Sequence, residues 1–531
     1  MDYSLYLVTD RSLLPEGQVR RESVNQALVG GATVVQIREK KADTGGGKQF
    51  LEVAQQSKSL CDLYGVHLII NDHVDIALAV GAAGVHLGQS DMPIDIARKL
   101  MPTGTVIGIS CNTVEEVRRA REANADYVGL GAVWDTQTKK LDKSPIGVRG
   151  LSDMLDALDG SDVRAVAIGG IKTTNLARLM HGSVSPTNRM LDGVAIVSDI
   201  VASPDPKKAA QTLKSIFSAC RQSTLLPLAR QPLRSRETIL DKALEIMNAV
   251  RKLNPLVHQV CIEFLPHTFN FEVRLSKITN TVVSTQSANV TLAMGASPIM
   301  ATAPEEMADL ANISAALLIN IGTLQSETLK GMLKAGHCAN SARIPIVLDP
   351  VGVGASAFRK DSVNKLLDIW HPTVIKGNAG ELAALAGSNE ATSKGVDSQG
   401  QLQNPVQFVR DFARKERCVV ALTGEIDFIS DGVRVFALKN GDPLLARVTG
   451  SGCMLGSCIA SYCAAANLLT KAGDFLSATI GAILMMTIAS ELAAKRATVN
   501  GPATFVPALI DEVAALGAES IMERARIEQI E

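Results

Sequence analysis

The fold of this chain is decided by two stretches of sequence, Val34-Val-Gln-Ile-Arg-Glu-Lys40 and Leu68-Ile-Ile-Asn-Asp72. Each stretch is a short apolar run of strand length that ends in amide or charged side chains. Six more runs follow the same rhythm with stretches of helical length between them, and the eight runs cover residues 5–8, 34–37, 68–70, 84–87, 106–109, 127–130, 163–168 and 194–197. Eight strand-then-helix units in about two hundred residues predict an α/β fold, a closed (β/α)8 TIM barrel.

Polar and glycine residues gather at the carboxyl ends of these runs. Active sites of such barrels occupy that end of the strands. The positions concerned are Gln36, Arg38, Lys40, Asn71, Asp72, Asp91, Ser110, Thr136, Lys139, Gly169, Gly170 and Ser198. Cations, carboxylates and bare glycine amides at one barrel mouth suit a pyrophosphate bound with Mg²⁺.

Asp72 and Asp91 are the candidate metal ligands of this mouth. Mg²⁺ prefers oxygen ligands and commonly bridges a carboxylate to substrate phosphates, so carboxylates at two strand ends can share one ion. Considered alone, Asp72 is also typical of a helix N-cap, and Gly169-Gly170 is also typical of a turn. The recurrence of phosphate-binding residues at successive strand ends favours the site.

The length and composition of the chain indicate a second domain and small-molecule substrates. The sequence has 531 residues, with 53 basic and 54 acidic side chains and no long run of either sign. We therefore expect neither nucleic acid nor a membrane as a partner. The expected division is a barrel over residues 1–222, a proline-containing linker over 223–237 and a second domain over 238–531.

Cysteine usage and hydropathy indicate a cytoplasmic protein. The nine cysteines form no Cys-x-x-Cys pair, and the N-terminus lacks the charged and apolar pattern of a secretion signal. Two apolar stretches, residues 448–470 and 475–490, approach membrane-spanning length. The first is rich in Gly, Ser and Cys and the second is short of a span, so we predict buried core helices.

The first half resembles thiamine phosphate synthase over about residues 3–205. The resemblance is carried by Leu5-Tyr-Leu-Val-Thr-Asp10, Val35-Gln-Ile-Arg-Glu-Lys40, Ile69-Ile-Asn-Asp72, Gly84-Val-His-Leu-Gly-Gln-Ser-Asp-Met-Pro93 and Asp126-Tyr-Val-Gly-Leu-Gly131. It implies that hydroxymethylpyrimidine pyrophosphate and a thiazole phosphate are condensed to thiamine phosphate and pyrophosphate. A related thiazole tautomerase barrel is an alternative, but the full Gln-x-Arg-x-Lys and Asn-Asp sets favour the synthase.

The same resemblance implies a role for each matching position. The pyrimidine pyrophosphate would be bound by Gln36, Arg38, Glu39, Lys40, Asn71, Ser110 and Lys139, and Mg²⁺ by Asp72 and Asp91. The thiazole phosphate would lie against Thr136, Gln137, Thr138, Gly169, Gly170, Val197 and Ser198. Trp134 stands where the family favours Phe, a change that removes no charge.

The second half shows a further series of short apolar strands, at residues 316–319, 344–348, 373–375, 419–422 and 433–437. They end in Asn320-Ile-Gly-Thr323, Asp349-Pro-Val-Gly-Val-Gly354, Lys376-Gly-Asn-Ala-Gly-Glu381 and Thr423-Gly-Glu425. This order predicts an α/β domain with ligand groups along one sheet edge. The last signal, Val448-Thr-Gly-Ser-Gly-Cys453, precedes a long apolar helix whose N-terminal amides suit a phosphoryl group.

These segments resemble hydroxyethylthiazole kinase, a ribokinase-like enzyme, over about residues 250–520. The resemblance implies ATP-dependent phosphorylation of the thiazole alcohol, whose product feeds the barrel, and by family analogy a homo-oligomer. It assigns ATP to Lys376 and Thr423, Mg²⁺ to Asp349 and Glu381, the thiazole to Met300 and Gly450, and catalysis to Cys453.

Cys453 occupies the place where related sugar kinases use an aspartate base. A thiol acts as a base near neutrality only if its surroundings lower its ordinary pKa of about 8.5. The alternatives are that Cys453 positions the alcohol, since positioning carries much of phosphoryl transfer, or that it is a buried structural thiol.

An insert interrupts the kinase motif at residues 260–277. The family runs Pro-Leu-Val-His, one residue, then Ile-Thr-Asn, whereas here Gln259 and Ile278 are separated by VCIEFLPHTFNFEVRLSK. Codons for Val-Cys and Lys match the two ends of a short intron, so one hypothesis is an intron translated in frame. The others are a surface excursion and an insert that disables the kinase.

The sequence therefore predicts a bifunctional cytoplasmic transferase of thiamine biosynthesis. One alternative is an active synthase joined to a kinase disabled by the insert. The other is a thiamine-pathway sensor that binds ligands without turnover. The presence of Asp72, Asp91, Lys139, Glu381 and Cys453 argues against the sensor, because pure binding does not need metal and phosphoryl-transfer groups together.

Overall fold

The computed structural model describes residues 1–38, 47–136, 144–225, 236–260, 283–388, 392–394, 397–399, 402–470 and 473–530. The chain divides into two compact units, Met1–Arg230 and Gln231–Glu531. Helix α9 (Pro206–Leu225) ends the described part of the first unit, and α10 (Arg236–Leu253) begins that of the second. The bounds 223 and 237 for the linker stay a prediction.

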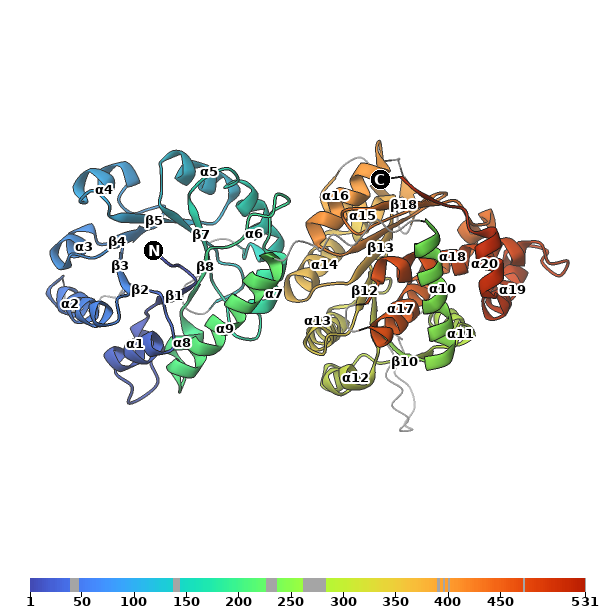
Figure 1. Ribbon diagram of the computed structural model, residues 1–531, viewed down its shortest axis with the longest axis horizontal. Coiled ribbons are helices and arrows are strands. Elements are labelled where there is room, and N and C mark those ends of the chain that lie inside the picture. The colour runs from blue at the N-terminus through green and yellow to red at the C-terminus, as the bar shows by residue number, and fades with distance from the viewer. Residues whose placement is uncertain are drawn as a thin grey trace. The chain divides into compact units, whose positions relative to one another are not determined.

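The first unit is a closed barrel of eight parallel strands surrounded by helices (Figure 1). The strands are β1 (Leu5–Val8), β2 (Val34–Ile37), β3 (His67–Asn71), β4 (Gly84–Leu87), β5 (Val106–Cys111), β6 (Tyr127–Leu130), β7 (Arg164–Ile168) and β8 (Gly193–Ile196). The helices are α1 (Arg20–Val29), α2 (Gly47–Leu63), α3 (Val74–Val80), α4 (Ile94–Leu100), α5 (Val114–Glu122), α6 (Gly147–Asp156), α7 (Leu176–Gly182), α8 (Ser198–Val201) and α9. The pairing of β8 with β1 closes the ring, which confirms the predicted barrel.

Alternating side chains explain why these strands are apolar along their whole length. In β1, Leu5 and Leu7 belong to the core between strands and helices, whereas Tyr6 and Val8 join the cluster inside the barrel. Both faces of the strand are thus buried, as expected for a parallel sheet covered by helices. A run such as Leu5-Tyr-Leu-Val8 therefore needs no polar positions until its end.

The second unit is an α/β domain built on a nine-stranded sheet in the order β10-β9-β11-β12-β13-β16-β17-β18-β19. The strands are β9 (Leu256–Val260), β10 (Ser297–Met300), β11 (Ala316–Asn320), β12 (Ile346–Asp349), β13 (Val374–Asn378), β16 (Val419–Thr423), β17 (Asp427–Ser430), β18 (Val435–Leu438) and β19 (Ile527–Gln529), with β14 (Thr392–Lys394) and β15 (Asp397–Gln399) paired separately. Strands from β10 to β16 are parallel, and the last three are antiparallel. Strands β9, β10, β17 and β19 were not predicted from the sequence, because they are short or only partly apolar.

Helices cover both faces of this sheet (Figure 1). They are α10, α11 (Ser284–Ala293), α12 (Met307–Ile313), α13 (Ser326–Ser341), α14 (Ala357–Ile369), α15 (Ala379–Ala386), α16 (Pro405–Glu416), α17 (Ser451–Leu469), α18 (Phe475–Ala494), α19 (Pro502–Ala515) and α20 (Ala518–Arg524). Ala316 and Leu318 of β11 pack in the core that contains α17 and α18. Leu317 and Ile319, one residue out of phase, pack in the core that contains α13 and α14. The period of two along the strand thus builds three layers.

Helices α17 and α18 are long and apolar enough to cross a membrane by length and composition alone. Within this unit, however, 78% of the apolar window of α17 and 83% of that of α18 are buried. Their side chains form the centre of a core that also contains sheet residues, so the prediction of core helices is confirmed.

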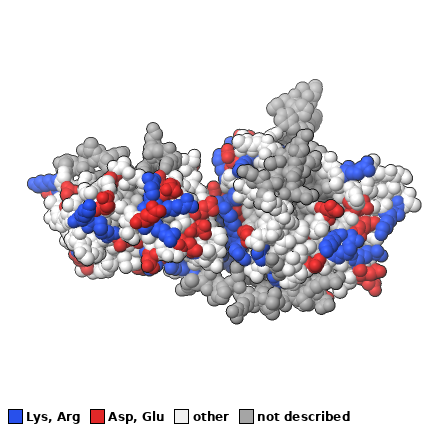
Figure 2. All heavy atoms as spheres, turned by 90° about the horizontal axis from the view of Figure 1, so that it is seen from above, with Lys and Arg blue, Asp and Glu red and all other residues white. Residues whose placement is uncertain are grey.

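On the face shown in Figure 2, basic and acidic side chains are interspersed, in keeping with the balanced composition.

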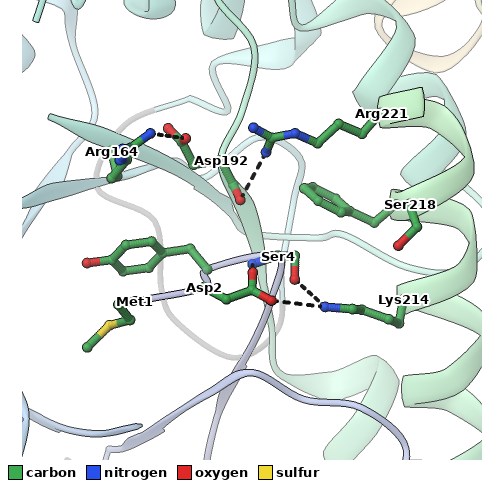
Figure 3. Close-up of a pocket in the computed structure, with 10 residues that line it drawn as sticks. Met1, Asp2, Ser4, Arg164, Asp192, Lys214, Ser218 and Arg221 are labelled. Atoms are coloured by element: carbon green, nitrogen blue, oxygen red, sulfur yellow. Dashed lines mark hydrogen bonds and ion pairs between the residues drawn. The ribbon is translucent and has the colours of Figure 1, made fainter. Parts of the chain in front are cut away.

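A cavity of about 540 Å³ lies at the amino ends of the barrel strands, away from the predicted mouth (Figure 3). Its cations are held by neighbouring protein groups. Arg164 pairs with Asp192 at 3.1 Å, Lys214 bonds to Asp2 and Ser4, and Arg221 donates to the Leu191 carbonyl. Protein groups therefore satisfy these cations, and groups at this end of a barrel contribute to stability rather than to ligand binding.

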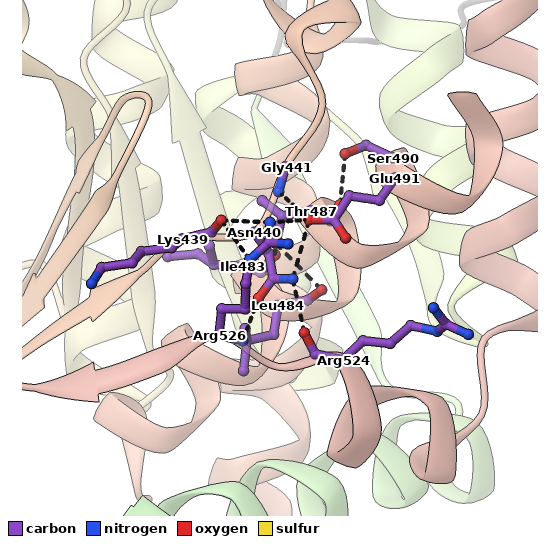
Figure 4. A network of polar contacts seen from close by, with 10 residues as sticks. All are labelled: Lys439, Asn440, Gly441, Ile483, Leu484, Thr487, Ser490, Glu491, Arg524 and Arg526. Atoms are coloured by element: carbon purple, nitrogen blue, oxygen red, sulfur yellow. Dashed lines mark hydrogen bonds and ion pairs between the residues drawn. The ribbon is translucent and has the colours of Figure 1, made fainter. Parts of the chain in front are cut away.

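The C-terminal strand of the second unit is held by a polar network centred on Glu491 of α18 (Figure 4). Its Oε1 accepts from Arg526 Nη2 at 2.6 Å, from the Gly441 amide at 2.8 Å and from Asn440 Nδ2 at 3.1 Å. The Asn440 Oδ1 in turn accepts from the Arg526 amide at 2.7 Å. One carboxylate thus ties helix α18 to the segments that follow β18 and precede β19.

We predict that Glu491→Ala destabilises the second unit by about 2 kcal/mol, because three donors lose their shared acceptor. Urea unfolding followed by the fluorescence of Trp370, which is buried in this unit, measures the change. Glu519→Ala on exposed α20 is the matched control and should shift the midpoint little. Equal midpoints for the two variants would show that the network contributes nothing.

Candidate active sites

One cavity of about 470 Å³ lies at the carboxyl ends of the barrel strands. Every described residue that the sequence assigned to the barrel site lines it: Gln36, Arg38, Asn71, Asp72, Asp91, Ser110, Thr136, Gly169, Gly170, Val197 and Ser198. The remaining assigned residues, Glu39, Lys40, Gln137, Thr138 and Lys139, lie outside the described residues. The barrel therefore brings side chains from positions 36 to 198 of the sequence around one space.

The two candidate metal ligands both face this cavity. Asp72 follows β3 with a φ of 62°, a conformation that non-glycine residues rarely adopt and that is found at functional sites. Asp91 accepts from the Gly88 amide at 2.7 Å, which holds its carboxylate at the mouth. Across the described ranges no group of three or more His, Cys, Asp or Glu is close enough to hold a metal by itself. Two carboxylates fit Mg²⁺ that completes its shell with water and phosphate.

Gly169 and Gly170 are glycines because the chain packs too closely for a side chain. Their φ angles are 101° and 68°. A Cβ on Gly169 would lie 2.6 Å from Ala132 Cα, and one on Gly170 would lie 2.8 Å from the Asp135 carbonyl oxygen. The loop after β6 is thereby held against the end of β7, next to the position expected for a phosphate.

A hydrogen-bonded series of side chains crosses the barrel interior, and three of its members, Gln36, His86 and Ser110, line the cavity. Gln36 Nε2 donates to Tyr6 Oη at 2.8 Å, and Tyr6 Oη lies 2.8 Å from Tyr127 Oη. Tyr127 Oη is 2.9 Å from His86 Nδ1, and His86 Nε2 is 2.9 Å from Ser110 Oγ. Neither tyrosine stands out in the sequence, because a tyrosine in an apolar run is typical of a core residue.

The ligand groups predicted for the second half follow parallel strands and therefore share one sheet edge. The register aligns Asn320 at the end of β11 with Asp349 at the end of β12. Asn378 at the end of β13 is aligned with Thr423 at the end of β16. Met300 ends β10 at the same edge.

A buried charged cluster occupies the middle of this edge. Lys376 Nζ donates to Asp349 Oδ1 at 3.0 Å, and both side chains are buried. Asn320 Nδ2 donates to Asp349 Oδ2 at 2.8 Å and also to Cys453 Sγ at 3.2 Å. Asn320, a residue without an assigned role in our sequence analysis, thus connects a candidate metal ligand with the candidate catalytic thiol.

Glu381 completes the cluster through backbone contacts. Its Oε1 accepts from the Gly352 amide at 3.0 Å and its Oε2 from the Asn378 amide at 2.9 Å. Asn378 accepts in return from the Glu381 amide, which forms a capping box at the start of α15. The carboxylate is therefore fixed between the loop after β12 and the helix after β13.

The electrostatics of the cluster follow from its burial. Removal from water raises the pKa of Asp349 and of Glu381, although the Lys376 ammonium opposes this in both. Burial lowers the pKa of Lys376, but the charges of Asp349, Glu381 and Cys453 outweigh it and raise that pKa to about 12. Two carboxylates around one ammonium leave excess negative charge, which a bound cation would relieve.

Gly450 precedes helix α17 as its N-cap and has a φ of 89°. A Cβ there would lie 2.2 Å from Val283 Cγ1, so the helix start packs directly on the segment before α11. Cys453 lies in the first turn, buried with Val283 and Val351. The N-terminal amides and positive dipole end of α17 therefore point to the edge that carries Lys376 and Asp349.

Comparison with known proteins identifies a family for each half of the chain. Residues 5–200 match the family described as thiamine monophosphate synthase, and residues 269–519 match the hydroxyethylthiazole kinase family. The probable thiamine biosynthetic bifunctional enzyme of Schizosaccharomyces pombe is 37% identical over 100% of this chain and 99% of its own length. The chain belongs to the family of bifunctional thiamine biosynthetic enzymes.

Other relatives support the same assignment. The thiamine biosynthetic bifunctional enzyme of Saccharomyces cerevisiae is 35% identical over 99% of this chain and 97% of its own length. The hydroxyethylthiazole kinase of Methanoculleus marisnigri is 41% identical over 54% of this chain and 92% of its own length. The bifunctional enzyme family thus accounts for both halves of the chain.

Within this bifunctional enzyme, the insert at 260–277 is described only at its first residue. Val260 ends β9, where it pairs with Ile319 of β11. Residues 261–282, including Asn280 of the family motif, lie outside the described residues. The hypotheses about the insert stay predictions.

Asp427 is a further buried acid near the kinase edge that the sequence did not indicate. Its Oδ1 accepts from the Gly424 amide at 3.0 Å and so holds the turn that follows Thr423. Burial raises its pKa to about 7, against the opposing effects of the Gly424 amide and the Lys376 charge.

We predict that Asp427→Asn makes the second unit relatively more stable as pH rises. A carboxyl with a raised folded-state pKa holds its proton better in the folded state, so its contribution to stability falls from about pH 4 to about pH 7. Asparagine keeps an acceptor for Gly424 and has no charge to bury. The measurement is the free energy of unfolding of variant and parent across this range. Asp361→Asn, at an exposed position of α14, is the control, and an equal pH dependence for both variants would contradict the prediction.

Proposed function

We propose that the barrel condenses hydroxymethylpyrimidine pyrophosphate with a thiazole phosphate and that the second unit phosphorylates the thiazole alcohol with ATP. The observation that carries the proposal is that every described residue assigned to the barrel site lines one cavity. The buried cluster of Lys376, Asp349, Glu381 and Cys453 supports the kinase half. The product of the second unit is then a substrate of the first.

In the barrel reaction, the bond between the pyrimidine methylene carbon and the pyrophosphate oxygen breaks, and a bond to the thiazole nitrogen forms. Arg38, with Lys40 and Lys139 beyond the described residues, would stabilise the charge that builds on the departing pyrophosphate. A loose, carbocation-like pyrimidine is captured by the thiazole nitrogen, so no protein nucleophile is needed. Gln36, Asn71 and Ser110 would orient the pyrimidine.

Asp72 and Asp91 would hold Mg²⁺, which supplies charge neutralisation at the pyrophosphate when bound. The Asp91 carboxylate accepts from the Gly88 amide, and the Asp72 backbone amide donates to the His86 carbonyl at 2.9 Å, which fixes the chain at each position. Gly169, Gly170 and Ser198 would receive the thiazole phosphate, with Thr136 and Val197 beside it.

In the kinase reaction, the alcohol oxygen attacks the terminal phosphoryl group of ATP, and ADP leaves. Lys376 and Thr423 would contact ATP, Asp349 and Glu381 would hold Mg²⁺, and Met300 and Gly450 would border the thiazole. The start of α17 would stabilise charge on the group in transfer. The Asn320 contact to Cys453 Sγ supports a role for the thiol beside Asp349, where it would act on the alcohol either as a base or as a positioning group.

The proposed enzyme takes small molecules only, acts in the cytoplasm and forms a homo-oligomer. The proposed enzyme binds neither nucleic acid nor membranes. A non-catalytic sensor of thiamine-pathway ligands is the competing function, and product formation distinguishes the two.

We predict that Asp91→Asn lowers thiamine phosphate formation at least a hundredfold and leaves kinase turnover unchanged, and that Glu381→Gln does the reverse. Each change removes one charge at one site. Asp91→Asn keeps the acceptor for the Gly88 amide, and Glu381→Gln keeps one of the two acceptors that serve the Gly352 and Asn378 amides. The measurement is thiamine phosphate and ADP formation by the same purified chain, so each activity is the control for the other. Loss of both activities in a folded single variant would contradict the two-site assignment.

We predict that the intact chain releases ADP in the presence of the thiazole alcohol, ATP and Mg²⁺. A version lacking residues 260–277 is assayed beside it. Turnover by the intact chain makes the insert a tolerated part of the kinase. Turnover only after deletion would mark the insert as a disabling segment, and mature transcript that still encodes these residues would exclude the intron hypothesis.

A further inference from the structure

The polar series inside the barrel joins two residues of the proposed pyrimidine site that lie on different strands. Gln36 is on β2 and Ser110 is on β5, and Tyr6 of β1 and Tyr127 of β6 meet between them across the barrel interior. His86 of β4 completes the connection to Ser110. We call Tyr6, Tyr127 and His86 the relay.

The barrel is built to hold the relay in place. A Cβ on Gly108 would lie 2.1 Å from Tyr127 Cζ, and a Cβ on Gly129 would lie 3.0 Å from His86 Cε1. Two glycines in neighbouring strands thus leave the space that the two rings occupy. The Tyr127 ring also packs against His86 at 5.4 Å and Tyr6 at 5.9 Å between centroids.

The number of protons on each group determines which group donates in each hydrogen bond of the relay. Tyr6 accepts from the Gln36 amide, so its single proton goes to Tyr127 Oη. Tyr127 then donates to His86 Nδ1, which requires a neutral imidazole with its proton on Nε2. Nε2–H donates to Ser110 Oγ. The Ser110 hydroxyl proton is therefore directed to an acceptor in the cavity, and the Gln36 carbonyl oxygen remains to accept from a ligand.

The phenols suit this arrangement. Burial raises the pKa of Tyr6 and of Tyr127 well above the ordinary value, so both keep their protons at neutral pH. Neither ring lies at the end of the series, so each hydroxyl has both a donor and an acceptor, as buried hydroxyls require.

We propose that Tyr6, Tyr127 and His86 are positioning residues of the synthase, which make Ser110 a hydrogen-bond donor and Gln36 an acceptor toward the bound pyrimidine pyrophosphate. The inference rests on the proposed function of the barrel. It specifies that the ligand presents an N–H donor at Gln36 and an acceptor, a ring nitrogen or phosphate oxygen, at Ser110. Donation by Ser110 depends on the whole series, because each member receives its orientation from the previous one.

The test is a double-mutant cycle in the full chain. Tyr127→Phe keeps the ring and breaks the series, and we expect it to lower kcat for thiamine phosphate formation about tenfold, the effect of one lost hydrogen bond. In a Ser110→Ala background, we expect Tyr127→Phe to lower kcat less than about twofold, because the Ser110 hydroxyl that the series orients is already absent. Tyr3→Phe is the matched control. Tyr3 packs on Tyr127 with centroids 5.0 Å apart but is outside the relay, and we expect no change.

Rescue at position 86 gives a second readout. Glutamine places an amide oxygen and nitrogen near the two imidazole nitrogens, so His86→Gln keeps both an acceptor for Tyr127 and a donor for Ser110. His86→Leu keeps neither. We expect His86→Gln to retain most of the activity that His86→Leu loses, with ADP release unchanged in both. This pair also decides the question if Tyr127→Phe does not fold.

The outcomes separate the relay from the proposed function. The relay would be overturned if Tyr127→Phe lowered kcat about tenfold in both the parent and the Ser110→Ala background, or if His86→Gln and His86→Leu lost equal activity. The synthase assignment would stand in both cases. A parent chain that forms no thiamine phosphate would overturn the proposed function, and this inference with it.

Discussion

Parallel strand pairing is the constraint on which both candidate sites depend. Parallel strands place all their carboxyl ends at one edge, so residues far apart in sequence meet wherever the strands are neighbours. In the barrel the edge is a ring, and Arg38 and Ser198 line the same cavity. In the second unit the sheet is open, and along its carboxyl edge Asn320 is aligned with Asp349 and Asn378 with Thr423.

The two sites manage buried polarity in different ways. The barrel interior uses neutral groups, and its tyrosines, histidine and serine satisfy one another in series. The second unit buries charge, with Lys376 between Asp349 and Glu381. Charged groups in a dry interior gain little net stability, and loss of one partner is costly. Retention of such a cluster at a sheet edge fits a site that stabilises phosphate charge and a cation.

Small residues set how closely the elements of each site approach. Gly169 and Gly170 allow the loop after β6 to rest on the end of β7, and Gly450 allows α17 to begin against Val283. Gly108 and Gly129 make room for aromatic rings inside the barrel. In each case a neighbouring atom occupies the space that a Cβ needs, so these glycines set the shape of the sites through backbone packing.

The barrel, the α/β character of the second unit and 11 of the 25 residues that line the barrel cavity could be predicted from the amino-acid sequence alone. Apolar runs such as Leu5-Tyr-Leu-Val8 have the length and spacing of buried parallel strands, and polar residues directly after them must lie at the strand ends. Asp72 and Asp91 were recognised because polar residues recur after successive apolar strands, and Glu381 was recognised through the resemblance to hydroxyethylthiazole kinase. The partly apolar strand β10 and the antiparallel strands β17 and β19 lacked such a signal.

Only the tertiary structure decided which groups touch. Tyr6 and Tyr127 are 121 residues apart, and each reads as an ordinary core residue until the closed barrel brings their hydroxyls together. The links from Asn320 to Cys453 and from Gly424 to Asp427 likewise depend on strand order and on the packing of α17. Periodicity specifies which face of an element is buried, but hydrogen bonds between distant residues require the register and closure that only the folded chain provides.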